Sequence, residues 1–126
     1  MATKGHAASV VAVVDDDKSV RSALTVALQS IGLTAFAFDS AESFLSFSRL
    51  PEVGCLITDL KMPGLSGLDL QARLRRDGYQ FPIVVITAHG FPEARAQAMA
   101  AGAIAFLDKP YDDNLLLETV RTVMKP

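Results

Sequence analysis

The sequence predicts an α/β fold in which a doubly wound, five-stranded parallel sheet carries helices on both faces. Five short apolar runs alternate along the chain with segments whose apolar residues recur at helical spacing. Short unbroken apolar runs bounded by turn residues are typical of strands buried on both faces. Strands joined by helices of this length form parallel βαβ units, and right-handed crossovers leave only a few doubly wound arrangements.

Local signals place each strand and helix. Gly32 ends the first helix, which is expected over residues 20–31. Asp39 and Glu42 form a capping box that opens a short second helix, and Pro51 ends it. The remaining helices are expected over 68–76, 92–102 and 112–124. The expected strands are 9–14, 33–38, a third that ends at residue 59, 82–86 and 104–107.

Size and composition indicate one domain spanning residues 1–126. Half of the residues are hydrophobic and the net charge is −2, so we expect a sizeable core and no direct nucleic acid binding. The apolar stretches are too short to cross a bilayer and residues 1–9 lack a signal-peptide core, which predicts a cytoplasmic protein without membrane attachment. The single cysteine, Cys55, is expected as a core residue.

Four of the apolar runs end on residues suited to phosphate chemistry. The first runs into Asp15-Asp16-Asp17, the third into Asp59, the fourth into Thr87 and the fifth into Asp108-Lys109-Pro110. Ligands of open parallel sheets bind at the carboxyl ends of the strands. The sequence therefore predicts that carboxylates, a hydroxyl and an ammonium group converge at one rim of the sheet.

The acidic residues at this rim predict a divalent metal site. Neighbouring carboxylates repel one another unless a cation intervenes, and Mg²⁺ binds one or two carboxylates while keeping coordination positions for water and phosphate oxygens. Asp15 and Asp16 lie directly at a strand end, and Asp59 joins them from another strand. For Asp17, a role as the cap of the following helix is the better interpretation.

The remaining rim residues suggest phosphoryl transfer. A carboxylate such as Asp59 can attack phosphorus to form an aspartyl phosphate. Lys109 can neutralise phosphoryl oxygens, and the Thr87 hydroxyl can donate a hydrogen bond to one of them. The chain has no glycine-rich dinucleotide or P-loop motif after any expected strand.

Four sequence motifs together resemble the receiver domain of bacterial response regulators. They are Val14-Asp15-Asp16-Asp17, the run from Thr58 to Gly67 with its Asp59-Leu60-Lys61-Met62-Pro63 core, Ile86-Thr87-Ala88-His89, and Phe106-Leu107-Asp108-Lys109-Pro110. The resemblance spans nearly the whole chain, and the details around His89-Gly90 and Phe106 are most similar to FixJ-type receivers. It implies a flavodoxin-like (CheY-like) sheet of strand order 2-1-3-4-5.

The resemblance also implies a role for each rim residue. Asp59 matches the phosphoacceptor, which takes its phosphoryl group from a sensor histidine kinase or a histidine phosphotransfer protein. Thr87 and Lys109 match the groups that hold the phosphoryl group. Phe106 matches the aromatic switch that turns inward when Thr87 is drawn toward the phosphate. Such a domain is a signalling module in two-component regulation and not an enzyme.

For the metal, the resemblance implies Mg²⁺, with Mn²⁺ as a substitute. Asp15 and Asp16 match the acidic pair that organises the ion, together with Asp59. The backbone carbonyl of Lys61 matches a further ligand.

We expect the output face to include the fourth helix, the fifth strand and the fifth helix. Its residues Ala98, Met99, Ala101 and Ile104 could meet a downstream output protein or domain, or a second copy in a phosphorylation-dependent homodimer. The alternative is that they pack the core of the domain itself, and for Ile104 the two interpretations are evenly balanced. A single-domain regulator and a piece of a longer one both fit the sequence.

Two other functions compete with a phosphate-accepting receiver. A haloacid-dehalogenase-like phosphatase would use Asp15 as its nucleophile, within the D-x-D of Asp15-Asp16-Asp17, but leaves Asp59 and its Met62-Pro63 loop unexplained. A degenerate receiver would act only as an interaction module, yet every acidic, Thr and Lys position of the motif is filled.

Overall fold

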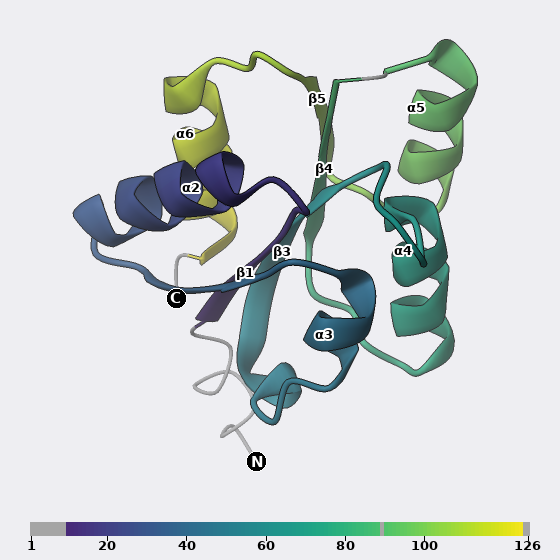
Figure 1. Ribbon diagram of the computed structural model, residues 1–126, viewed down its shortest axis with the longest axis horizontal. Coiled ribbons are helices and arrows are strands. Elements are labelled where there is room, and N and C mark those ends of the chain that lie inside the picture. The colour runs from purple at the N-terminus through teal and green to yellow at the C-terminus, as the bar shows by residue number, and fades with distance from the viewer. Residues whose placement is uncertain (1–9, 89, 125–126) are drawn as a thin grey trace.

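The computed structural model describes residues 10–88 and 90–124 (Figure 1). All five strands run parallel, in the order β2-β1-β3-β4-β5, which confirms the predicted fold class and strand order. The strands are β1 (Val10–Val14), β2 (Thr34–Phe38), β3 (Val53–Asp59), β4 (Ile83–Thr87) and β5 (Ala105–Asp108). The helices are α2 (Lys18–Ser30), α3 (Ala41–Leu45), the 3-10 helix η1 (Leu50–Glu52), α4 (Gly67–Arg76), α5 (Pro92–Ala100) and α6 (Asp113–Met124).

Helices cover both faces of the sheet, as the alternation of the sequence predicts. In Figure 1, α2 and α6 lie on one side of the strands and α3, α4 and α5 on the other. Leu28 of α2 and Leu116 of α6 belong to one buried cluster, whereas Phe44 of α3 and Leu74 of α4 belong to the second. The three central strands β1, β3 and β4 are buried along their entire length because both of their faces are covered.

Cys55 lies in β3 and is fully buried, as predicted. Burial raises the pKa of its thiol to about 12, because a thiolate loses its hydration in the apolar core. The thiol therefore stays protonated and serves as a small core residue.

The capping box predicted at the second helix is wrong. Ser40, not Asp39, precedes the first turn of α3, and its hydroxyl accepts a hydrogen bond from the Ser43 amide at 3.1 Å. The Glu42 carboxylate instead accepts a hydrogen bond from the Leu65 amide at 3.1 Å, so a tertiary contact replaces the local one. Pro51 does not end this helix either, because α3 stops at Leu45 and Pro51 lies within η1.

The other predicted boundaries within the described residues agree with the structure or differ by one or two residues. The predicted start of the first strand, Ser9, lies outside the described residues. Pro82 directly precedes β4, and its carbonyl accepts a hydrogen bond from the Leu56 amide at 2.9 Å. Pro92 begins α5, as predicted. Within 10–88 and 90–124, no helix is long and apolar enough to cross a membrane.

Candidate functional site

Asp15 follows β1 and is fully buried at the carboxyl end of the sheet. Its amide donates to the Phe38 carbonyl at 3.1 Å, and its carboxylate oxygen Oδ1 accepts from the Asp17 amide at 2.9 Å. Asp17 itself caps α2, because its carboxylate accepts from the Ser19 amide at 2.8 Å and from the Val20 amide at 3.4 Å. The three consecutive aspartates therefore have different tasks, and Asp17 caps the helix as predicted.

Asp59 is the last residue of β3, and its side chain lies near the surface with 7% of the residue exposed. The following loop folds back against this strand end, where the Gly67 amide donates to the Leu60 carbonyl at 2.8 Å. A Cβ atom at position 67 would collide with the Asp59 backbone oxygen. Glycine is therefore required at 67 to bring the loop this close to Asp59.

The carboxylates of Asp15, Asp16 and Asp59 form one cluster. Each offers an oxygen atom, and these oxygens all lie within 4.8 Å of one another. Asp15 and Asp59 are buried and Asp16 is exposed, so the cluster opens to solvent on one side. Several carboxylate oxygens with an open side fit Mg²⁺, which binds few protein carboxylates and keeps water or phosphate in its remaining positions. Lys61 lies two residues beyond Asp59, and metal ligation by its carbonyl stays a prediction.

Lys109 brings a positive charge to this cluster. It follows β5, and its amide donates to the Thr87 carbonyl at 2.7 Å. Its ammonium nitrogen Nζ lies 2.9 Å from Asp15 Oδ2 and 3.4 Å from Asp59 Oδ2. Burial by itself would lower the pKa of Lys109, but the hydrogen bond to Asp15 and the negative charges of both aspartates raise it overall. The ammonium group therefore stays charged at neutral pH.

The balance of charges opposes ionisation of Asp59. Burial raises the pKa of its carboxyl group and the charge of Asp15 raises it further, while Lys109 only partly offsets the two. Among the described residues, the Lys109 ammonium group pairs with Asp15 and Asp59, while the cluster contains three carboxylates. A divalent cation would supply the missing positive charge.

Thr87 and Phe106 complete the arrangement at neighbouring strands. Thr87 is the last residue of β4, fully buried, and pairs in register with Asp108 of β5. Phe106 pairs with Val85 and is 4% exposed, with its side chain in the core on the α4 and α5 side of the sheet. The structure thus brings the predicted strand ends of β1, β3, β4 and β5 to one rim.

The output face matches the prediction only in part. Met99 and Ile104 are each 41% exposed, and Ala101 is exposed too. Ala98 is fully buried, so its expected place on this surface is wrong. It lies on the inner side of α5, where its carbonyl accepts a hydrogen bond from Gln71 Nε2 at 3.0 Å.

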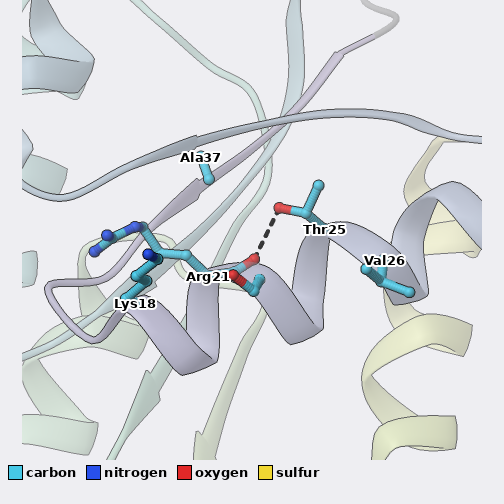
Figure 2. Close-up of a pocket in the computed structure, with 6 residues that line it drawn as sticks. Lys18, Arg21, Thr25, Val26 and Ala37 are labelled. Carbon is cyan, nitrogen blue, oxygen red and sulfur yellow. Dashed lines mark hydrogen bonds between the residues drawn. The ribbon is translucent and has the colours of Figure 1, made fainter.

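A separate hollow lies on the α2 side of the sheet (Figure 2). It lies between α2 and β2 and is lined by Lys18, Arg21, Ser22, Thr25, Val26 and Ala37, without a carboxylate among these residues. Arg21 also reaches the site, because its Nη1 donates to the Asp15 backbone carbonyl at 2.9 Å. Sequence reasoning missed this support, since a cation on a helix face ordinarily indicates only solvent exposure.

The chain is similar to proteins of one family. The sequence matches the family model for the response regulator receiver domain over residues 11–121. The chain is 42% identical over 118 residues to the response regulator protein TodT of Pseudomonas putida, covering 94% of this chain and 52% of the relative. It is 36% identical over 125 residues to the transcriptional regulatory protein FixJ of Bradyrhizobium diazoefficiens, covering 99% and 59%. The chain therefore spans little more than half the length of these relatives.

A solved structure shares the whole architecture. The crystal structure of a response regulator receiver protein from Pseudoalteromonas atlantica superposes with a TM-score of 0.86 at 26% identity. The superposition covers 91% of this chain and 96% of that one.

Proposed function

Since this chain belongs to the response regulator receiver domain family, we propose that it accepts one phosphoryl group on Asp59 from a sensor histidine kinase or a histidine phosphotransfer protein. The observation that supports Asp59 most directly is its position. It is the last residue of β3 and belongs to a carboxylate cluster that opens to solvent at Asp16 and whose other buried member, Asp15, already binds Lys109. The domain is thus a module of two-component signal transduction.

The transfer is a substitution at phosphorus. An Asp59 carboxylate oxygen forms the new P–O bond while the bond from phosphorus to the donor histidine nitrogen breaks, and the donor imidazole keeps the electron pair and takes up a proton. Asp59 must be ionised to attack, so its raised pKa works against the reaction until a cation neutralises the cluster. Mg²⁺ held by Asp15, Asp16 and Asp59, with the Lys61 carbonyl as a further ligand, would supply that neutralising charge.

Two residues at the ends of the neighbouring strands bind the transferred group: Thr87 ends β4 and Lys109 directly follows β5. The Lys109 ammonium lies 3.4 Å from Asp59 Oδ2, within reach of oxygens added to that carboxylate. The Thr87 hydroxyl donates a hydrogen bond to another phosphoryl oxygen. The resulting shift of Thr87 changes the position of Phe106. Both residues therefore affect the conformation of the output face as well as the transfer of the phosphoryl group.

We assign the downstream step to a separate output protein or domain. The relatives TodT and FixJ are a response regulator protein and a transcriptional regulatory protein, and the matched part covers only 52% and 59% of their lengths. A receiver of this kind acts by docking, and the exposed residues Met99, Ala101 and Ile104 of the output face are the proposed contact.

The phosphatase alternative finds no support in this geometry or in the comparisons. It needs Asp15 as a free nucleophile, but Asp15 is fully buried. Its Oδ2 binds Lys109 and its Oδ1 accepts from the Asp17 amide, so both oxygens are engaged. Asp59 is the more accessible carboxylate.

Intact-mass spectrometry after incubation with acetyl phosphate tests the assignment. With Mg²⁺ or Mn²⁺ we expect a single phosphate adduct, which disappears with a chelator and in Asp59→Asn. Asp17→Asn is the matched control and should be phosphorylated normally, because asparagine also caps helices. An unchanged adduct in Asp59→Asn would show that another residue accepts the phosphate.

A further inference from the structure

Arg95 on α5 contacts Phe106 of β5 in two ways. The centre of its guanidinium group, Cζ, lies 5.6 Å from the centroid of the Phe106 ring. Its Nη1 also donates a hydrogen bond to the Phe106 backbone carbonyl at 3.1 Å. One side chain thus holds both the ring and the main chain of the same residue.

We propose that Arg95 is a positioning residue that latches the Phe106 ring in its inward, buried position. This inference rests on the proposed function, in which Phe106 is the element that responds to the phosphoryl group through Thr87. Arg95 would then decide how readily the ring leaves the core before Asp59 is phosphorylated. It would also make the ring and α5 change position together.

The physical basis is that a phenyl ring has no polar group by which it could be anchored. Phe106 can be held only by packing and by the attraction of a cation to its π face. The Arg95 guanidinium supplies that cation, and its hydrogen bond to the Phe106 carbonyl fixes where the cation stands. In the part of the chain that the structure describes, no ion pair draws the Arg95 guanidinium away to a carboxylate.

Gly90, which lies between β4 and α5, is also close to the ring. A Cβ atom at Gly90 would lie 3.2 Å from Phe106 Cε1 and would overlap the Asp108 carboxylate. Gly90 and Arg95 therefore both lie close to Phe106, and only 4% of the residue is exposed. We expect removal of Arg95 to expose the part of the ring that its guanidinium group contacts.

A fluorine label on the Phe106 ring would test the latch directly. We would introduce 4-fluorophenylalanine at position 106 and measure the ¹⁹F resonance together with its accessibility to a soluble paramagnetic agent. Without phosphate, Arg95→Ala should shift the ratio of buried to exposed ring conformers about tenfold toward exposed, the combined effect of one cation–π contact and one hydrogen bond. Arg95→Met, which keeps an apolar side chain over the ring but no cation, should shift the ratio in the same direction by less.

Arg73→Ala is the matched control. Arg73 is an exposed arginine on α4, and its guanidinium group forms a 3.3 Å ion pair with Asp77. It should leave the fluorine signal unchanged. The latch is refuted if Arg95→Ala leaves the signal at its original position, or if Arg73→Ala moves it equally.

Beryllofluoride with Mg²⁺, a mimic of the aspartyl phosphate, separates this inference from the proposed function. The mimic should return the Arg95→Ala ring toward the buried position, because Thr87 then favours that conformer without Arg95. If the mimic leaves the ring of Arg95→Ala exposed, the proposed link from Asp59 through Thr87 to Phe106 fails, while the comparison made without phosphate still decides whether Arg95 holds the ring. If the original chain responds and Arg95→Ala matches it in both states, the latch alone is wrong.

Discussion

Asp59 is held under conditions that oppose its own negative charge. Burial and the neighbouring Asp15 both raise the pKa of its carboxyl group, and Lys109 offsets only part of this. The folded protein therefore binds a proton at Asp59 more readily than the unfolded chain does. This stabilising contribution is fully present below the unfolded pKa and is lost as the pH rises through the folded pKa.

We predict that Asp59→Asn raises the free energy of unfolding at pH 7 in the absence of divalent cations. Asparagine removes the buried charge, and about 1 kcal/mol is a typical size for such a point-mutation effect. The gain should shrink toward acidic pH, where Asp59 is protonated and neutral in both states. Urea unfolding as a function of pH measures this, with Asp17→Asn as the control. A less stable Asp59→Asn variant at pH 7 would contradict the electrostatic account.

The aspartates that follow β1 should differ in their effect on metal binding. Asp16 contributes an oxygen to the cluster with Asp15 and Asp59, whereas Asp17 caps α2. Calorimetric titration with Mg²⁺ should show affinity reduced at least about tenfold in Asp16→Ala, comparable to the loss of one charged ligand contact. Asp17→Asn should bind normally. The reverse order would place the wrong aspartate in the metal site.

At the level of the elements, a very short helix supports the loop that follows the phosphoacceptor. The helix α3 has five residues, and from it the Glu42 carboxylate reaches the Leu65 amide in the β3–α4 loop. The start of α4 is held separately by a capping box, in which the Ser66 hydroxyl accepts from the Asp69 amide and the Asp69 carboxylate accepts from the Ser66 amide. Contacts from α3 and from the capping box of α4 thus hold the Lys61-containing loop at the end that leads into α4.

We predict that Glu42→Ala loosens this loop and weakens Mg²⁺ binding severalfold. One hydrogen bond to a charged acceptor is lost, about 1 to 2 kcal/mol, and part of this affects the position of the Lys61 carbonyl. Hydrogen exchange at the Leu65 amide and Mg²⁺ titration report the two effects. Glu52→Ala is the control, because Glu52 forms only an exposed ion pair with Arg49. Unchanged protection of Leu65 would show that Glu42 does not hold the loop.

At the level of the whole molecule, the two faces of the sheet have different surroundings. The core on the α3, α4 and α5 side of the sheet (Figure 1) contains Phe106. Met99 on α5 and Ile104, which directly precedes β5, are exposed. The α2 side exposes Val26, on the opposite side of the sheet. We therefore expect a conformational change at Phe106 to reach the α5 side first.

We predict that beryllofluoride with Mg²⁺ shifts the chain toward a dimer through the α5 side. The modification can shift the monomer–dimer equilibrium only by the difference between the affinities of a second copy for the two conformers. Sedimentation velocity measures the shift, which Ile104→Glu should abolish. Val26→Glu on α2 is the control and should leave it intact. Identical monomers with and without the mimic would exclude the dimer and leave docking to a different protein as the output.

The order of residues along the chain was sufficient to predict the strands and the residues that meet at the rim of the sheet. Uninterrupted apolar runs mark strands buried on both faces, and parallel strands must end at the same edge, so Asp15, Asp59, Thr87 and Lys109 could be placed together from their positions alone. The helix-capping role of Asp17 followed from the same reasoning. The strands, the rim residues and the helix cap depend only on residue spacing within one segment and on the rule that all strands of the sheet run parallel.

Only the tertiary structure decided which neighbours each side chain meets. Glu42 has the spacing of a capping box, yet it binds the Leu65 amide, 23 residues away, because packing brings that loop beside α3. Ala98 faces the core and Met99 the solvent, a choice set by how α5 is rotated against the sheet. The contact of Arg95 with Phe106 and the raised pKa of Asp59 have the same origin. Distances between different elements, and the loss of hydration on burial, arise from packing and leave no periodic pattern in the sequence.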